Sequence, residues 1–166
     1  MLVVVSGLPG SGKSALSDGI GLARGVPVLS VDPIESAILR AGIPRSFETG
    51  LAAYTVAEAC AGAFLAAGLD VVIDAVSSVE PAREMWRGLA ARHGTPLRVI
   101  VCSLDPAEAL VRLAGRARGL ALPEPTGDDL RARAEEWTPW PGPHLLLDSL
   151  QPVEVNLDRA LAWLEG

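Results

Sequence analysis

The sequence predicts a single-domain, three-layer α/β fold, in which a five-stranded, mostly parallel sheet carries helices on both faces. Short apolar runs alternate with longer segments of helical periodicity, and parallel strands need such crossover helices. The length of 166 residues suits one domain. Because 49% of the residues are apolar and 20% are charged, the composition favours a globular protein over a disordered or fibrous one.

Five short runs rich in valine, isoleucine or leucine have the length and composition of buried strands. They are residues 3–5, 26–31, 69–74, 97–103 and 145–147. The segments between and after them show the apolar spacing of helices. These expected helices are residues 13–23, 33–41, 47–67, 79–92, 105–118, 126–137 and 155–165. The loop between the fifth and sixth helices is rich in glycine and proline, and we expect a short lid at about residues 116–126 within one domain, 1–166.

Composition and charge also restrict the setting of the protein. The chain opens on an apolar strand-like run without the features of a secretory signal, and no apolar run approaches the roughly 20 residues of a membrane span. Cys60 and Cys102 lie in apolar contexts and are expected to be buried thiols in a reducing compartment. We therefore expect a cytoplasmic protein without a membrane partner. The net charge of −6 argues against general affinity for nucleic acid.

One motif carries the functional interpretation. The sequence Gly-Leu-Pro-Gly-Ser-Gly-Lys-Ser at residues 7–14 matches the Walker A pattern and lies between a predicted strand and a predicted helix. Its glycines let backbone N–H groups surround phosphate oxygens, and the helix that follows adds the positive end of its dipole. The residues expected to contact the nucleotide are Gly7, Pro9, Gly10, Ser11, Gly12, Lys13, Ser14 and Leu16.

Two residues of this motif have specific expected roles. Lys13 should reach the β- and γ-phosphates of ATP, and the Ser14 hydroxyl should be a ligand of Mg²⁺. Lys13 is also the only lysine of the chain, since every other basic side chain is arginine. The one compact ammonium therefore stands where phosphate binding requires it.

The sequence resembles the small P-loop kinases grouped with polynucleotide 5′-kinase, zeta toxin and chloramphenicol phosphotransferase, a group of AAA-type ATP-binding kinases. The phosphate loop, Asp32 after the second predicted strand, and Val-Val-Ile-Asp-Ala at residues 71–75 carry this resemblance. It covers nearly the whole chain. It implies a P-loop NTPase fold and transfer of phosphate from ATP to a hydroxyl group.

The resemblance also assigns roles to two carboxylates. Asp32 matches the residue that accepts the proton of the attacking hydroxyl, although it could instead only cap the helix expected from Pro33. Asp74 ends an apolar strand as a Walker B acid would and is expected to hold Mg²⁺, directly or through water. In the resembled family this residue can instead contact the acceptor.

Arginines flank the predicted lid, where such residues stabilise charge on the transferred phosphoryl group. We expect Arg116 to be catalytic and to bind the nucleotide together with Arg112, four residues earlier on the same helical face, with Arg118 as a further candidate. Arg83 matches an arginine of the family, but a solvent-exposed helix residue would look the same. Trp137 and Trp140 could form a shelf for adenine or pack their loop onto the core.

The function expected from these features is that of an ATP-dependent kinase, with Lys13, Asp32 and Arg116 as catalytic residues and ATP and Mg²⁺ as cofactors. A small-molecule hydroxyl compound is the preferred acceptor, and a polynucleotide 5′-hydroxyl group is the alternative. A nucleotide-dependent ATPase or switch without an acceptor is the competing class, and it would not need Asp32. We expect a monomer or a weak homodimer.

Overall fold

The five apolar runs form one parallel sheet in the computed structural model, which describes residues 1–114 and 119–166. The strand order is β2-β3-β1-β4-β5, and all the pairs of neighbouring strands run parallel. The strands are β1 (Leu2–Gly7), β2 (Val28–Ser30), β3 (Val71–Asp74), β4 (Leu97–Ser103) and β5 (Leu145–Asp148). The predicted fold class is confirmed.

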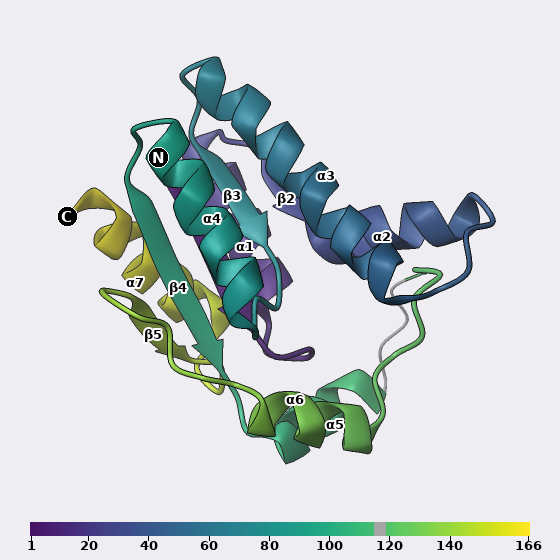
Figure 1. Ribbon diagram of the computed structural model, residues 1–166. Helices are drawn as coiled ribbons and strands as arrows, with labels where there is room; N and C mark the ends of the chain where they lie inside the picture. The colour runs from purple at the N-terminus through teal and green to yellow at the C-terminus, as the bar shows by residue number, and fades with distance from the viewer. Residues whose placement is uncertain (115–118) are drawn as a thin grey trace.

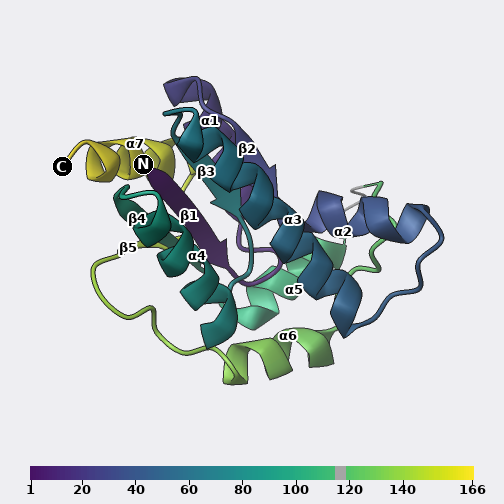
Figure 2. The same cartoon turned by 45° about the horizontal axis from the view of Figure 1, so that its top comes forward.

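Seven helices belong to the described part of the chain and connect these strands (Figure 1). They are α1 (Lys13–Arg24), α2 (Val31–Arg40), α3 (Phe47–Ala66), α4 (Glu80–Arg92), α5 (Pro106–Ala114), α6 (Gly127–Glu135) and α7 (Val153–Glu165). Helices α3 and α4 cover one face of the sheet, whereas α1 and α7 cover the other (Figures 1 and 2). Because both faces are covered, every residue of β1 and β3 is buried, and these strands read as continuous apolar runs.

The register of the sheet brings the polar strand ends to one edge. Val5 of β1 lies opposite Asp74 of β3, and Gly7 at the end of β1 lies opposite Cys102 of β4. Ser30, the last residue of β2, also pairs with Asp74. The carboxyl ends of parallel strands are the usual ligand-binding edge of such a sheet, so the glycine-rich turn and Asp74 start from adjacent positions.

Helices α5 and α6 form a hairpin beside the carboxyl ends of the strands (Figure 1). They pack around a small apolar cluster of their own, made of Leu104, Ala109, Leu113 and Leu130. The segment before α6 reaches α2, where the backbone N–H of Ala121 donates a hydrogen bond of 2.8 Å to the Ser36 hydroxyl. The α5–α6 hairpin and the segment around Ala121 therefore border the same edge of the sheet as α2.

Helix α3 is apolar on all sides. Its residues Ala53, Ala57 and Ala61, spaced four apart, are fully buried, whereas Phe47 and Leu51 are exposed. Among the described residues, α3 is the one helix whose length and composition would also allow it to cross a membrane, so the expectation that no apolar run approaches that length is wrong. One such helix is weak evidence for a membrane protein, because helices of globular proteins meet the same criteria.

Replacing Gly21 tests the packing of α1 on β2. A Cβ atom at Gly21 would overlap Val28 Cγ2 and lie 3.2 Å from the Val26 carbonyl oxygen. We expect Gly21→Ala to lower the free energy of unfolding by about 1–3 kcal/mol, since added volume strains a packed core. Urea denaturation measures the change. Part of the loss should be recovered when Val28→Ala is added, because the two side chains occupy the same space.

A matched glycine serves as the control for this prediction. Gly50 of α3 has no other atom closer than 3.9 Å to an added Cβ. Gly50→Ala should therefore stabilise the protein slightly, by up to about 1 kcal/mol, through helix propensity. Equal effects of the two substitutions would contradict the packing described for Gly21.

Candidate active site

The glycine-rich turn between β1 and α1 is held by close backbone contacts. A Cβ atom at Gly7 would lie 2.5 Å from Ser11 Oγ and 2.6 Å from the Cys102 carbonyl oxygen. At Gly10, where φ is 85°, a Cβ atom would lie 2.9 Å from the Ala109 carbonyl oxygen of α5. Only glycine fits these two positions, so the turn is fixed between β4 and α5.

The start of α1 has the groups that bind an anion. Gly12 precedes the helix in a left-handed conformation, and no side chain caps the first N–H groups. Lys13 is only 6% exposed, and no ion pair of Lys13 occurs within residues 1–114 and 119–166. The Ser11 hydroxyl is also buried without a hydrogen-bond partner among the described residues. Buried polar groups of this kind are normally paired, which indicates a bound anion at this turn.

Two adjoining cavities open beside the turn. The first, of about 240 Å³, is lined by Gly10, Gly12, Lys13, Ser14, Ala15 and Arg112. The second, of about 280 Å³, is lined by Ser11, Gly12, Ala15, Leu16, Cys102, Arg112, Ser149, Gln151, Val153 and Asn156. The volumes suit the phosphate chain and the nucleoside of one nucleotide. The predicted contacts Gly10, Ser11, Gly12, Lys13, Ser14, Leu16 and Arg112 thus line these cavities, whereas Gly7 and Pro9 do not.

Arg112 on α5 links the two cavities. Its Nη2 atom donates a hydrogen bond of 2.6 Å to the Ser149 carbonyl oxygen, in the turn between β5 and α7. Its Nη1 atom lies 4.0 Å from the position of a Cβ atom at Gly12. A guanidinium group therefore lies directly beside the phosphate turn. Arg116 and Arg118 fall in residues 115–118, outside the described residues, and their predicted roles stay predictions.

Asp74 has one satisfied and one unsatisfied carboxylate oxygen. Its Oδ2 atom accepts a hydrogen bond of 2.7 Å from Ser30 Oγ. Its Oδ1 atom is buried and has no hydrogen-bond partner among the described residues. An orphaned carboxylate oxygen at the end of β3, next to the phosphate turn, fits a metal ion or its bound water.

Cys102 shows that opposite charges flank the end of β4. Burial raises the pKa of its thiol to about 12, with the charge of Lys13 lowering it and the charge of Asp74 raising it. Lys13 and Asp74 therefore both lie close to this thiol, which stays neutral and unreactive. Cys60 differs, because it is exposed on α3. The prediction that both cysteines are buried is wrong for Cys60.

Asp32 lies in the first turn of α2 and is not the cap of that helix. The helix begins at Val31, with Ser30 in the capping position, so the alternative that Asp32 caps a helix starting at Pro33 is wrong. Burial raises the pKa of Tyr54 and of Glu35, and the charge of Asp32 raises both further. Asp32 is thus within electrostatic reach of Tyr54 on α3 and of Glu35 on its own helix.

Tyr54 and Arg133 belong to the same electrostatic neighbourhood, and the sequence did not identify them. The Tyr54 hydroxyl accepts a hydrogen bond of 3.1 Å from the backbone N–H of Ser77, in the loop after Asp74. The charge of Arg133, on α6, reaches Tyr54 and Glu35. Tyr54 is the only tyrosine of the chain, which was the one available signal. Nothing in the sequence near Arg133 sets it apart from the other arginines.

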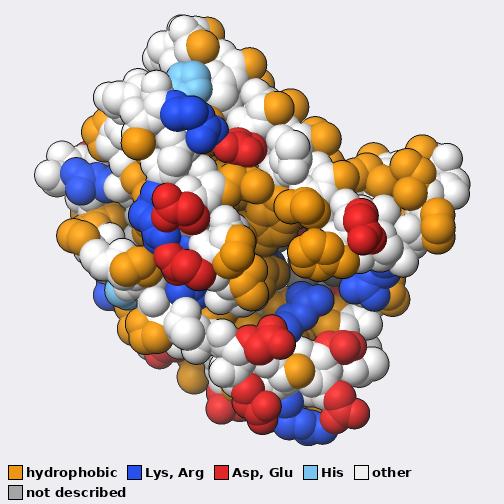
Figure 3. Space-filling view, viewed as in Figure 1, with side chains coloured by type: hydrophobic (Ala, Val, Ile, Leu, Met, Phe, Trp, Pro, Cys, Tyr) orange, Lys and Arg blue, Asp and Glu red, His pale blue; other side chains and the backbone are white. Residues whose placement is uncertain are grey.

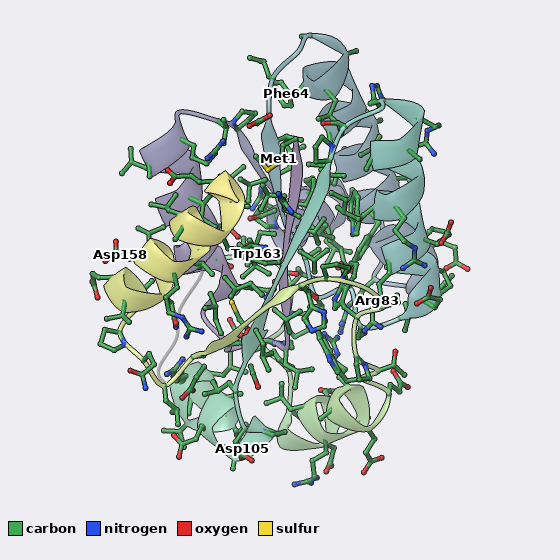
Figure 4. The ribbon with its side chains drawn as sticks, turned by 90° about the vertical axis from the view of Figure 1, so that its left-hand side faces the viewer. Met1, Phe64, Arg83, Asp105, Asp158 and Trp163 are labelled. Carbon is green, nitrogen blue, oxygen red and sulfur yellow. The ribbon has the colours of Figure 1, made fainter. Side chains whose placement is uncertain are left out.

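Arg83 is a structural residue in the interior. It is fully buried, and its guanidinium donates five hydrogen bonds of 2.7–3.2 Å. The acceptors are the carbonyl oxygens of Ser77, Ser78, Thr138 and Pro139 and the Thr138 hydroxyl. Arg83 thus ties the loop after β3 to the segment between α6 and β5 (Figure 4). Of the two alternatives for this position, the solvent-exposed helix arginine is wrong.

The two tryptophans pack around this arginine. The Arg83 guanidinium carbon lies 5.5 Å from the ring centre of Trp137 and 5.2 Å from that of Trp140. Trp140 is buried, and its Nε1 atom donates a hydrogen bond of 3.2 Å to Ser6 Oγ. Neither tryptophan lines the two cavities described above, but Trp137 lines a third cavity, of about 210 Å³, together with Leu8 and Cys102. Trp140 therefore packs its loop onto the core, whereas the adenine shelf stays a prediction for Trp137.

The fold and the phosphate turn together are those of a P-loop nucleotide-binding protein. Comparison with known families agrees, since residues 2–137 match the family model AAA_33, described as an AAA domain. The chain belongs to this family, and the resemblance to small P-loop kinases is confirmed. No curated protein matched the sequence.

Solved structures share the fold over nearly the whole chain. A sugar kinase from a Janibacter species has a TM-score of 0.74 at 22% identity, with 99% of this chain and 94% of that chain covered. A gluconokinase from Sinorhizobium meliloti has a TM-score of 0.71 at 24% identity, with 98% of this chain and 90% of that chain covered. An APS kinase from Mycobacterium tuberculosis, in complex with AMPPNP and APS, has a TM-score of 0.72 at 22% identity. The match covers 99% of this chain and 97% of that chain.

Replacing Asp74 should separate stability from metal-dependent binding. Asp74→Asn keeps the hydrogen bond from Ser30 and removes a buried charge with an unsatisfied oxygen. We expect the free energy of unfolding without Mg²⁺ to stay equal or to rise, because burying an unpaired charge is costly. The Mg²⁺-dependent part of nucleotide affinity should be lost, as measured by calorimetric titration with and without Mg²⁺.

Asp70→Asn is the control, since Asp70 pairs with Arg24 and the amino terminus of the chain. Unchanged Mg²⁺ dependence in Asp74→Asn would contradict this role.

Replacing Arg83 tests its structural role. Arg83→Met removes all five hydrogen bonds and leaves buried carbonyl groups unpaired, so we expect a loss of about 3–5 kcal/mol in the free energy of unfolding. Arg87→Met is the matched control on the same helix. Arg87 pairs with Glu80 and Glu84 near the surface, and its loss should cost about 1 kcal/mol or less. Denaturant titration compares the two variants, and equal losses would refute the structural role of Arg83.

Proposed function

We propose that the protein is an ATP-dependent kinase that transfers the γ-phosphate of ATP to a hydroxyl group of a small molecule. One observation carries the proposal. The sheet edge with the phosphate turn also holds Asp74, and Asp32, in the first turn of α2, is within electrostatic reach of Tyr54 on α3. A hollow in the surface between α3 and α6 would provide a second space beyond the phosphate turn (Figure 3). A protein that only hydrolyses ATP needs no second space, whereas a kinase needs one for the acceptor.

The nucleotide would occupy the two adjoining cavities. Its phosphates would lie against the N-terminus of α1 and Lys13, and its nucleoside would lie beside Leu16 and the turn after β5. Arg112 would contact both parts, because it lines both cavities. The related fold of an APS kinase in complex with AMPPNP supports ATP as the nucleotide.

The residues at the phosphate turn fit a Mg²⁺ ion. Ser14 lines the phosphate cavity, and the orphaned Asp74 Oδ1 atom lies at the adjacent strand end. The described residues contain no group of three His, Cys, Asp or Glu that could hold a metal by themselves. This suits Mg²⁺, which takes most of its ligands from phosphates and water. When bound, Mg²⁺ would neutralise negative charge on the β- and γ-phosphates.

The reaction would be an in-line transfer. Asp32 would accept or orient the proton of the acceptor hydroxyl, whose oxygen forms the new bond to the γ-phosphorus while the bond to the β–γ bridging oxygen breaks. Lys13 would hold the β- and γ-oxygens, and Arg112 would add positive charge beside them. Arg116 remains the proposed catalytic arginine of a lid at about residues 116–126.

A small-molecule acceptor is favoured over a polynucleotide. The net charge of −6 opposes nucleic-acid binding. Solved structures of the same fold include a sugar kinase, a gluconokinase and an APS kinase, which act on small molecules. We further propose a cytoplasmic location and a monomer or weak homodimer.

Two substitutions test the kinase assignment. Lys13→Ala should abolish productive ATP binding, because it removes the buried ammonium from the phosphate cavity. Asp32→Asn should leave ATP affinity intact and lower phosphate transfer by about 10²–10⁴-fold, the usual contribution of a general base. Calorimetry measures the binding, and transfer from γ-labelled ATP to a panel of alcohols, sugars and nucleosides measures the activity.

Asp18→Asn is the control for Asp32→Asn, because Asp18 is an exposed carboxylate on α1. It should change neither ATP affinity nor transfer. Full transfer by Asp32→Asn would refute the base assignment. Hydrolysis without transfer to any member of the panel would favour the ATPase or switch class instead.

A further inference from the structure

The space beyond the phosphate turn has a basic side chain at its rim. Figure 3 shows a hollow on this face, lined mostly by hydrophobic side chains, with Lys or Arg side chains at its edge near α6. Arg133 and Arg45 are basic residues of this region. The positive charge of each one acts to lower the pKa of Glu35 on α2.

Arg133 is half-buried, and no partner of its guanidinium belongs to the described part of the chain. Across residues 1–114 and 119–166 it makes no hydrogen bond and no ion pair. Its neighbour on the same helix, Arg131, is exposed and pairs with Asp128. Half-buried guanidinium groups are usually paired, because desolvation of the charge is costly. Arg133 therefore has unused donors at the rim of the hollow.

Arg133 and Asp32 share two neighbours. The charge of Arg133 opposes the rise in the pKa of Glu35 and Tyr54 that burial causes, and it lowers the pKa of Asp129, so Arg133 lies within electrostatic reach of α2 and α3 as well as of its own helix. Asp32 acts on Tyr54 and Glu35 with the opposite sign. Tyr54 and Glu35 are thus close to both groups. A bound molecule that spans Tyr54 could reach Asp32 at one end and Arg133 at the other.

The acidic residues near Arg133 leave its guanidinium available to a ligand. Glu35 and Asp129 are within electrostatic reach of Arg133 and Arg45, but neither acid forms an ion pair with them in the described part of the chain. Asp129 is instead bound to the Thr126 hydroxyl and backbone N–H, as part of the cap of α6. The planar guanidinium of Arg133 can therefore offer paired donors to a ligand, a geometry that matches carboxylate, phosphate and sulfate groups.

We propose that Arg133 binds an anionic group of the acceptor, a carboxylate or a phosphate or sulfate ester, while Asp32 receives the hydroxyl that takes the phosphate. This inference rests on the proposed kinase function and narrows its acceptor to anionic hydroxyl compounds. Arg133 would set specificity by contact with the substrate and would take no part in bond making.

A binding experiment tests the anion site independently of catalysis. The protein is first saturated with AMPPNP and Mg²⁺, so that the phosphate turn is filled, and inorganic sulfate is then titrated by equilibrium dialysis with labelled sulfate. We expect one further sulfate site in the wild type and at least about 10-fold weaker binding in Arg133→Gln. Arg133→Lys should recover part of the affinity, and Arg131→Gln should match the wild type. Circular dichroism and AMPPNP affinity establish that each variant is folded.

A second experiment uses acceptor pairs that differ only in charge. Hexonates are compared with hexitols, and sugar phosphates with free sugars, so that the two arms separate carboxylate from phosphate-ester recognition. We expect kcat/KM to be at least about 10-fold higher for the anionic member of one pair. Arg133→Gln should abolish this preference by raising KM, with kcat little changed.

Three results decide between the proposals. Equal use of the neutral and anionic members, or sulfate binding unchanged in Arg133→Gln, would overturn the role of Arg133. Sulfate binding that depends on Arg133, without transfer to any compound, would overturn the kinase function and support an anion site alone. Arg133-dependent sulfate binding with transfer to an anionic compound supports both.

Discussion

The close backbone contacts of two glycines are the constraint on which the candidate site depends. Gly7 lies against the Cys102 carbonyl of β4, and Gly10 lies against the Ala109 carbonyl of α5. These contacts fix the phosphate turn between a central strand and the first helix of the α5–α6 hairpin. Because α5 also carries Arg112, the same contact sets the distance between the turn and the guanidinium that reaches the β5–α7 turn. Both cavities for a nucleotide follow from it.

The opposite side of the site depends on Arg83 in a similar way. Its hydrogen bonds join the loop after β3 to the segment after α6, and the same loop holds the Tyr54 hydroxyl through Ser77. Tyr54 on α3 is thereby tied to the segment that follows α6, the helix that carries Arg133. A phosphate turn fixed by backbone contacts and a β3 loop fixed by a buried guanidinium therefore frame the proposed two-substrate site.

The sequence predicted the features that depend on local pattern. The strands, the helices and residues 7–14 were recognisable because periodicity and the Walker A motif are local, and Asp74 because it ends an apolar run. Tyr54 and Arg133 were missed, since their proximity arises from the packing of α3 and α6. The burial of Arg83 and the exposure of Cys60 also depend on tertiary packing. In an all-apolar helix such as α3, composition does not say which face is covered.

The central claim is that this sheet edge transfers phosphate to a second small molecule. The most direct measurement is a single-turnover reaction of the protein with γ-labelled ATP in the presence of a mixture of small hydroxyl metabolites, with the labelled products separated and identified by mass spectrometry. The account predicts that label appears in a phosphate monoester of a small anionic compound and that Asp32→Asn suppresses it. Label found only in inorganic phosphate, at the same rate with and without the mixture, would contradict the account.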